Sequence, residues 1–440
     1  MNLYFAILFD MEERELLSKI KELRGESKKL ATSSDEARKN ALILVAKALE
    51  ENKEYLFAEN RKDLEKAKER GISDSIYHRL IFSEEKLSSV VKGLNDLSLL
   101  PDPIGKIREK RELDADFVLE KVAFPLGVIG MIFEARPDAL VQIAGLALRS
   151  GNGVILKGGK EAQCSNRALI EVIKKATANT EISDGWILGI ESHADVDTLL
   201  KAEGDVDLLI PRGSNAFVKH VMDNTSIPVM GHADGICSVF VDESADLELA
   251  VKVVTDSKIQ YPAACNAVET ILVHEGIYRE FLPMLKESFD KHGVVVHGDE
   301  KSASIIDVIA ATEEDYHTEY LSLECVIKVV SSIEEAIAHI ASHGSHHTDA
   351  IITRDKANEA KFFQEVDSAD VFSNCSTRFA DGFRFGLGAE VGISTSKLHA
   401  RGPVGLDGLT TTKWLLRGNG ETVAEYSGKN GKSFKHRELI

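Results

Sequence analysis

The chain of 440 residues has few cysteines, few prolines and no long apolar run. Its five cysteines are scattered and include no CxxC pair, which argues against a disulfide framework or a structural zinc site and favours a reducing compartment. Nine prolines and 32 glycines are too few for a fibrous or disordered protein. The apolar start, residues 2–9, is too short to span a membrane and lacks the features of a signal peptide. We expect it to form a first strand or a docking segment.

Positive charge is also scarce, because 71 acidic residues stand against 53 basic ones and give a formal net charge of -18. Without a basic stripe that could neutralise phosphates, a nucleic-acid role is disfavoured. The acidic balance by itself identifies no partner. The length is sufficient for two or three domains with full cores.

The pattern of apolar residues changes twice along the chain. Residues 12–100 have helical spacing, with Ser34 and Ser83 as helix starts and Gly71 as a C-cap. Residues 107–122 contain an alternating stretch, which predicts a hairpin that could reach out of the domain. Short apolar runs then alternate with helices, so we expect parallel sheets covered on both faces. The expected strands lie near residues 128–133, 154–156, 208–210 and 236–241, and those of a second α/β unit near residues 271, 294, 326 and 351.

One cysteine lies where chemistry is expected. Cys265 follows Tyr261 and Pro262 among small residues, between a helical segment and the apolar run 271–273. Small neighbours let a substrate or a cofactor ring approach the sulfur closely. A lone cysteine in an arbitrary chain is more often buried and inert. Cys265 is therefore a candidate nucleophile because of the motifs around it.

Two glycine turns are expected between a strand and a helix. In the first, Gly158 and Gly159 allow close approach of a ligand to the backbone, and Lys157 and Lys160 could bind a phosphate or simply be solvated. The second turn, residues 210–215, places Ser214 as an N-cap or as part of a pyrophosphate site. Two such turns on neighbouring strands of one sheet favour a nucleotide crevice.

Several motifs together resemble a known family. Residues 126–138 and 150–161 are similar to the cofactor domain of the aldehyde dehydrogenase superfamily, and residues 261–266, 373–382 and 399–405 fit, more narrowly, the gamma-glutamyl phosphate reductase family of proline synthesis. The resemblance covers roughly residues 12–417. It implies an α/β, aldehyde-dehydrogenase-like fold with two Rossmann-like parallel-sheet domains and a small β oligomerisation arm.

The resemblance also implies a division of the chain. We expect an NADPH-binding domain at residues 1–106 and 128–233, a catalytic domain at residues 234–410, and an arm with a tail at residues 107–127 and 411–440. An arm with an unpaired edge predicts a homodimer or a larger homo-oligomer. The family implies a cytoplasmic enzyme with a small-molecule substrate, functional coupling to glutamate 5-kinase, and no nucleic acid, membrane or metal.

The family's chemistry gives the candidate residues their roles. Cys265 would attack the acyl phosphate carbonyl of L-glutamate 5-phosphate and expel phosphate, and NADPH would reduce the resulting thioester to glutamate 5-semialdehyde. The Cys265 amide is a natural oxyanion donor. The cofactor residues implied by the resemblance are Lys157, Gly158, Gly159 and Lys160 near the adenosine, Gly213, Ser214 and Asn215 at the pyrophosphate turn, and Glu319 at the nicotinamide ribose, where a surface carboxylate is the alternative.

Two departures from the wider superfamily carry information. Aldehyde-oxidising members have a glutamate that activates water for thioester hydrolysis, whereas the corresponding turn here, residues 229–235, has none. Its absence agrees with a reductase, although His232 and Asp234 could still act on water. The superfamily's asparagine oxyanion donor is also replaced, and either Arg136 or Asn266 could serve instead.

The substrate's carboxylate calls for a cation. Arg378, in a loop that also contains Ser376, is the first candidate because a bidentate Arg–carboxylate contact suits it, and Arg401 is the second, for carboxylate or phosphate. Each arginine could instead form a structural ion pair. Three nearby histidines suggest a metal, but no carboxylate or cysteine lies at ligand spacing, so a polar loop is expected at His343, His346 and His347.

Three alternatives remain at this point. The chain could be a hydrolytic NAD(P)-dependent aldehyde dehydrogenase, or the reductase part of a fused kinase–reductase. A catalytically silent scaffold is a third alternative, which the intact Cys265 and the two glycine turns disfavour.

Overall fold

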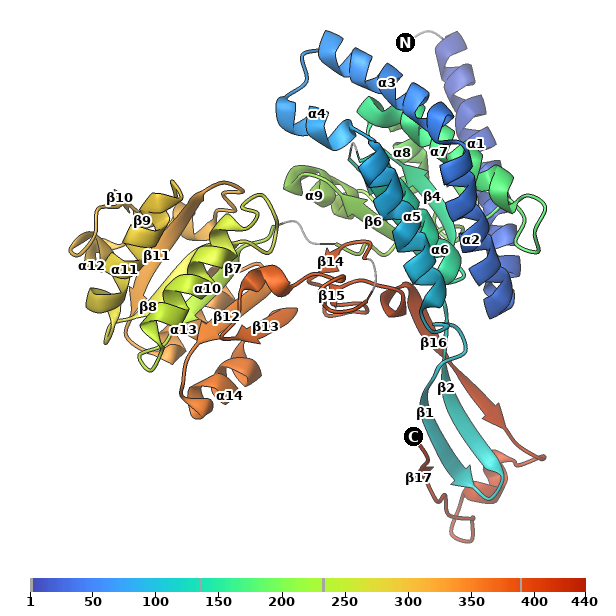
Figure 1. Cartoon of the computed structure of the whole chain (residues 1–440). Helices are drawn as coiled ribbons and strands as arrows, with labels where there is room; N and C mark the ends of the chain where they lie inside the picture. Colours follow the sequence, from blue (N-terminus) through green and yellow to red (C-terminus); the bar gives the residue numbers. More distant parts are fainter. Residues whose placement is uncertain (1–2, 135, 232–233, 388–389) are drawn as a thin grey trace.

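Two α/β units and a long antiparallel arm make up the molecule (Figure 1). This computed structural model describes residues 3–134, 136–231, 234–387 and 390–440. Elements α1 to α9 with strands β3 to β6 are called the first unit, and elements β7 to β13 with helices α10 to α14 the second unit. No helix among the described residues is both long and apolar enough to cross a membrane.

Five helices precede the first strand of the chain. Ser34 and Ser83 accept hydrogen bonds from the amides of Ala37 and Lys86, which confirms both predicted helix starts. Gly71, after α3, has a φ of 62°, as expected of a C-cap glycine. The helices are α1 (Leu3–Ala31), α2 (Asp35–Glu51), α3 (Lys53–Glu69), α4 (Asp74–Leu80) and α5 (Glu84–Leu99).

The strand expected within residues 2–9 is wrong. Helix α1 begins at Leu3 and continues through residue 12 into the predicted helical region without a break. No glycine or proline separates the two stretches, and extending an existing helix by one residue is far easier than nucleating a new element.

The sheet of the first unit is parallel, with the strand order β5-β4-β3-β6. Side chains of β3 alternate between two cores. Ile129 and Met131 pack with α2, α5, α6 and α7, while Val128 and Ile132 pack with α1 and α8. Its other elements are β3 (Val128–Phe133), α6 (Pro137–Arg149), β4 (Gly153–Lys157), α7 (Gln163–Thr177), β5 (Ile187–Gly189), α8 (His193–Leu200), β6 (Leu208–Arg212) and α9 (Asn215–Asp223).

The sheet of the second unit is also parallel and has seven strands, in the order β10-β9-β11-β8-β7-β12-β13. One face packs with α10 and α11, and the other with α13 and α14. Its elements are β7 (Cys237–Val241), α10 (Leu247–Ile259), β8 (Val268–His274), α11 (Tyr278–Lys291), β9 (Val295–Gly298), α12 (Glu300–Ala303), β10 (Ile309–Ala310), β11 (Glu324–Val330), α13 (Ile333–His343), β12 (Thr348–Ile352), α14 (Lys356–Glu365) and β13 (Asp370–Ser373).

Strand β7 lies at the centre of this second sheet, between β8 and β12, and does not continue the first sheet. A short apolar run shows that a strand is buried but not which sheet contains it.

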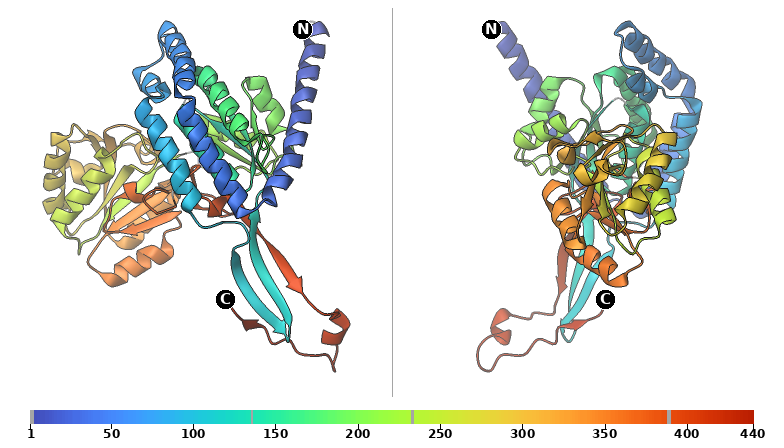
Figure 2. Two further views of the ribbon diagram at one scale, coloured as in Figure 1. Left: turned by 45° about the vertical axis from the view of Figure 1, so that its right-hand side comes forward. Right: turned by 90° about the vertical axis from the view of Figure 1, so that its left-hand side faces the viewer.

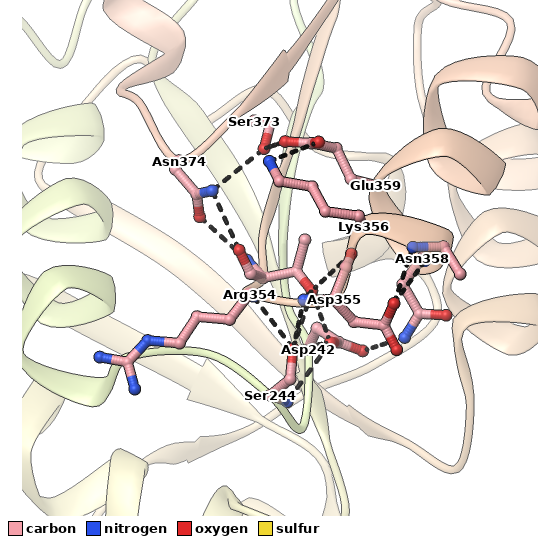
Figure 3. A network of polar contacts seen from close by, with 11 residues as sticks. Asp242, Ser244, Arg354, Asp355, Lys356, Asn358, Glu359, Ser373 and Asn374 are labelled. Carbon is pink, nitrogen blue, oxygen red and sulfur yellow. Dashed lines mark hydrogen bonds and ion pairs between the residues drawn. The ribbon is translucent and has the colours of Figure 1, made fainter.

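The carboxyl end of β7 is held by hydrogen bonds between side chains (Figure 3). Asp242, which is almost fully buried, accepts hydrogen bonds from Ser244 Oγ at 2.6 Å, Thr353 Oγ1 at 2.7 Å and Asn358 Nδ2 at 3.0 Å.

The arm contains strands from distant parts of the chain. Strands β1 (Ile107–Asp114) and β2 (Phe117–Pro125) form the predicted hairpin, which is confirmed. Strand β16 (Thr410–Arg417) pairs with β2, and β17 (Arg437–Glu438) pairs with β1. The four strands project away from both units (Figures 1 and 2), and Trp414 and Leu416 of the outer strand β16 are exposed.

Candidate active site

A cleft of about 1200 Å³ lies between the two units and is lined by residues of both. The first unit contributes Arg136, Arg212 and Gly213, which follow or end strands β3 and β6. In the order β5-β4-β3-β6, the chain moves outward from β3 to β5 and then returns to the other side of β3. Strands β3 and β6 therefore form the topological switch point, where open parallel sheets bind ligands.

Cys265 enters the cleft from the second unit, in the loop between α10 and β8. Its thiol is free and partly buried. The loop is held from behind, because Cys237 Sγ donates to the Cys265 carbonyl oxygen at 3.2 Å. A Cβ atom on Gly235 would lie 2.2 Å from the same oxygen, so only glycine allows this approach. The backbone of the candidate nucleophile is thus firmly positioned.

The side chain of Asn266 ties two loops together. Its Nδ2 donates to the carbonyl oxygen of Ala380 at 2.7 Å, and the backbone carbonyl oxygen of Asn266 accepts from Thr377 Oγ1 at 2.7 Å. The side-chain amide is therefore engaged with the backbone of the substrate loop. To serve as the oxyanion donor, Asn266 would have to release Ala380.

Four arginines line the cleft, namely Arg79, Arg136, Arg212 and Arg378. Arg136 is half-exposed and donates to Asp138 Oδ2 at 3.3 Å. Arg378 is largely buried, and its Nε donates to Gln260 Oε1 at 2.9 Å. Burial lowers the pKa of Arg378. Burial also lowers the pKa of Arg212, and the charge of Glu390 partly offsets this second shift. Within the described residues, the Arg212 guanidinium makes no hydrogen bond or ion pair, so its donors are free to bind an anion.

Two predicted substrate residues lie elsewhere. Ser376 is buried outside the lining of the cleft, where its Oγ accepts from Ser257 Oγ at 3.2 Å and from the Arg378 amide at 3.3 Å. Arg401 pairs with Asp367, with Nη1 at 3.0 Å from Oδ1, and it does not line the cleft either. Arg401 thus has the structural ion pair that the sequence left open.

The pyrophosphate turn and Glu319 meet at the cleft. Ser214 precedes α9 but its side chain makes no capping bond, so its hydroxyl is available. Asn215 Nδ2 donates to Glu319 Oε2 at 3.2 Å and also to Asp234, which joins the two units across the cleft. His232, the other residue considered as a base, lies outside the described residues.

The first glycine turn lines a separate hollow of about 910 Å³ beside β5. Gly158, Gly159 and Lys160 all contribute to it. A Cβ on Gly158 would lie 2.1 Å from Asn166 Nδ2, so glycine is required there. Lys157 does not line the hollow; it is 8% exposed, burial lowers its pKa, and its ammonium has no hydrogen-bond or ion-pair partner among the described residues.

A buried ion pair supports the cleft from inside the second unit. Lys258 Nζ donates to Glu269 Oε2 at 2.6 Å, and both side chains are fully buried. The other oxygen of Glu269 accepts from the amide of Leu321 at 3.4 Å, and Leu321 lines the cleft near Glu319. Burial raises the pKa of Glu269 to about 7, although Lys258 opposes the shift. The pair therefore positions the Glu319–Leu321 segment.

Three functional positions were missed from the sequence. Arg212 could have been found, because it directly precedes Gly213 in a turn already singled out. Glu390, whose Oε2 accepts from the Gly382 amide at 2.7 Å and whose pKa is raised by burial, has no local signal. Gly235 also has none, since its role depends on the close approach of the Cys265 backbone.

The fold is that of the aldehyde dehydrogenases. The aldehyde dehydrogenase family model matches residues 10–324. An acetylating aldehyde dehydrogenase from Geobacillus thermoglucosidasius has a similar structure, with a TM-score of 0.65 at 16% identity, over 94% of this chain and 99% of that chain. The predicted α/β fold with two parallel-sheet units is confirmed.

Other matches are much more similar in sequence. The gamma-glutamyl phosphate reductase of Ruminiclostridium cellulolyticum is 52% identical over 413 residues, which are 94% of this chain and 95% of the relative. The structure of the Thermotoga maritima enzyme of that name has a TM-score of 0.91 at 41% identity, over 93% of this chain and 99% of that chain. The chain therefore belongs to the gamma-glutamyl phosphate reductase branch of the aldehyde dehydrogenase family, as its motifs predicted.

Proposed function

We propose that this protein reduces L-glutamate 5-phosphate to L-glutamate 5-semialdehyde and phosphate, with NADPH as reductant, in proline synthesis. The observation that supports this most directly is the cleft, where the Cys265 thiol lies with four arginines and a strand–glycine–helix turn. A substrate with two anionic ends and an electrophilic carbonyl between them suits this set of groups. The names of the similar proteins agree with it.

Cys265 supplies the nucleophile. Its sulfur forms a bond to the acyl carbon, the bond from that carbon to the phosphate oxygen breaks, and phosphate leaves with the electron pair. The backbone amide of Cys265 is available to stabilise the oxyanion. The nicotinamide cofactor, when bound, supplies the hydride that converts the thioester carbonyl to the aldehyde level. The carbon–sulfur bond then breaks, and the thiolate of Cys265 is regenerated.

The arginines divide between the two ends of the substrate. Arg212 ends the strand that leads into the pyrophosphate turn, and its guanidinium has no partner among the described residues, so we assign the acyl phosphate to it, with Arg136 in the same cleft. Arg378, on the substrate loop, is assigned to the α-carboxylate. The α-amino group needs an acceptor, and Asp381 and Glu390 line the same cleft.

The residues present fit a dinucleotide. Gly213 and Ser214 offer backbone amides and a hydroxyl without a capping bond at the start of a helix. Gly158, whose lack of a Cβ accommodates the Asn166 side chain, lines the neighbouring hollow. A cation favours the 2′-phosphate that distinguishes NADPH from NADH. Lys157, buried and without a partner among the described residues, and Lys160, which lines the hollow, are the groups we assign to that preference.

The arm and the substrate suggest the protein's associations. An exposed outer strand is a surface for pairing with another copy, so we propose a homodimer or larger homo-oligomer. An acyl phosphate is hydrolysed readily in water, so functional coupling to glutamate 5-kinase is proposed. Five free thiols suit a reducing compartment, and we propose the cytoplasm.

The reverse reaction tests the proposal. NADP⁺, inorganic phosphate and glutamate semialdehyde are supplied, and NADPH absorbance is followed for the wild type and for Cys265→Ser. The proposal expects phosphate-dependent NADPH formation that disappears in the variant. Formation without phosphate would identify a hydrolytic dehydrogenase, and no formation by folded wild-type protein that binds NADP⁺ would overturn the proposed reaction.

A further inference from the structure

Outside the cleft, three metal-ligating side chains meet on the surface of the second unit. Glu313 and His317 lie four residues apart around the short 3₁₀ turn η2 (Glu314–His317), and His343 is the last residue of α13. Nε2 of His343 lies 2.8 Å from Glu313 Oε1, and Nε2 of His317 lies 4.0 Å from the same oxygen. Ligand atoms of all three lie within 4.8 Å of one another.

Glu313 lies 30 residues upstream of His343 in the sequence, so local spacing around His343 could not reveal this carboxylate. The other two histidines of the predicted polar loop do not take part. His346 Nδ1 bonds to the carbonyl oxygen of Asp367 at 2.7 Å, and His347 is buried beside Thr348.

His343 is held through both ring nitrogens. Its Nδ1 lies 3.0 Å from the carbonyl oxygen of His339 and 2.7 Å from the hydroxyl oxygen of Ser342, and its Nε2 faces the Glu313 carboxylate. When Nδ1 donates to the carbonyl oxygen, the lone pair of a neutral ring lies on Nε2 beside Glu313, where it can bind a metal ion. Metal-binding histidines commonly donate their other N–H to a carbonyl in this way.

The spacing and ligand types suit a transition metal. Ligand atoms about 2.1 Å from Zn²⁺ lie roughly 3.0–3.4 Å apart at octahedral to tetrahedral angles, close to the 2.8 Å observed. His317 is half-exposed and can swing inward from 4.0 Å. Two imidazoles with one carboxylate favour Zn²⁺ or its neighbours over Mg²⁺ or Ca²⁺. The opposing factor is Lys328, whose Nζ lies 3.3 Å from Nδ1 of His339, the ring stacked on His343.

We propose that Glu313, His317 and His343 form a surface site for a divalent transition-metal ion such as Zn²⁺. The ion joins η2 to the end of α13, and it thereby anchors the chain just before Glu319 and Leu321, which line the cleft. None of the three proposed metal ligands takes part in the proposed reaction. The metal site and the proposed function are therefore tested independently of each other.

Calorimetric titration of the full-length protein with Zn²⁺ tests the site. A Cys265→Ser background removes the reactive thiol as a competing ligand. We expect one ion to bind per chain, and Glu313→Gln and His317→Ala each to weaken binding by more than about tenfold, the loss that even an outer-shell partner can produce. His220→Ala, which removes an exposed histidine of α9, is the matched control and should leave binding unchanged.

Thermal unfolding gives a second readout. Zn²⁺ should raise the Tm of the background protein and of His220→Ala, but not that of His317→Ala. Circular dichroism confirms that each variant is folded, and His317 is exposed enough for its replacement to be tolerated. Equal Zn²⁺ affinity in background and ligand variants, or no binding at all, would overturn the proposal.

Discussion

The two parallel sheets contribute to one cleft in different ways. The first sheet offers residues at the carboxyl ends of its strands, where Arg212, Gly213 and Ser214 line the cleft. The second sheet presents Cys265 before the start of β8 and supports it with a tight backbone contact, while a buried ion pair holds the Glu319–Leu321 segment of the same cleft. Binding a ligand requires accessible groups, whereas holding a reactive atom requires groups that are already satisfied by the protein.

Electrostatics show the same contrast. Among the described carboxyl groups, the four with a raised pKa, namely Glu269, Asp349, Asp370 and Glu390, all follow Cys237 in the chain, and burial is the first cause in each. Shifted carboxyl groups of the first unit, such as Asp35 and Glu191, have lowered pKa values because cations pair with them. The carboxyl groups whose charge is most costly to bury therefore all lie in the part of the chain after Cys237.

Breaking the buried pair should have the largest effect. Lys258→Met leaves the Glu269 carboxylate without its partner, and we expect the free energy of unfolding to fall by about 3–5 kcal/mol in urea denaturation. Adding Glu269→Leu should restore much of the loss. Arg167→Ala breaks the matched surface pair of Arg167 with Glu191 in the first unit. This variant should lower the free energy of unfolding by less than about 1 kcal/mol. Equal losses for the two pairs would remove the contrast between the units.

The tight contact behind the nucleophile gives the second prediction. Gly235→Ala forces the Cys265 backbone to move, and a displacement of about 1 Å can lower activity about 100-fold. Gly231→Ala is the control, because a Cβ there meets no atom closer than 3.6 Å. The measurement is kcat in the reverse reaction, with NADP⁺ affinity determined separately. Similar kcat values for the two variants would show that the Gly235 contact does not position Cys265.

The arginines allow the two sides of the cleft to be separated. Loss of a bidentate, charge-assisted contact costs about 1.5–3 kcal/mol, so Arg212→Lys should raise the KM for phosphate about tenfold or more in the reverse reaction. Arg378→Lys should instead raise the KM for the semialdehyde. If each variant changed both constants equally, the assignment of one arginine to each end of the substrate would be wrong.

The pH dependence of stability is the smallest expected effect. Glu269 has a folded pKa of about 7, above its ordinary value of 4.5, so the folded state binds the proton more tightly. Its contribution to stability is therefore full below about pH 4.5 and is lost as the pH rises through about 7. Between pH 5 and 7 we expect the free energy of unfolding to fall by about 1–2 kcal/mol more for the wild type than for Glu269→Gln. Parallel pH profiles for the two proteins would contradict the raised pKa.

Local sequence signals predicted the fold well where they act over a few residues. Ser34 and Ser83 start helices because a side-chain oxygen meets an amide three residues on, and Gly213 follows a strand in the expected turn. Strand β5, with only three residues, was missed because it is too short for a recognisable pattern. The strand predicted within residues 2–9 was wrong because an apolar run alone does not distinguish a strand from a helix.

Features of the site that depend on distant contacts could not be predicted. Lys258 and Glu269 look like ordinary polar residues until the fold buries both. Arg378 and Arg401 were the first and second candidates for the substrate carboxylate, and the ion pair of Arg401 with Asp367 could not be seen in the sequence. Glu313 approaches His343 through the packing of η2 on α13. In each case the pairing partner, not the residue type, determines the role.

The arm has a consequence for the order in which the chain folds as it is made. Arg417 of β16 bonds to Glu120 of β2, 297 residues earlier, and the whole second unit lies between them. At about 5–20 residues per second, a ribosome needs roughly 15–60 s to make that stretch. Throughout that interval the β1–β2 hairpin has emerged with one long edge open, so the nascent protein must avoid mispairing until its own last strand arrives.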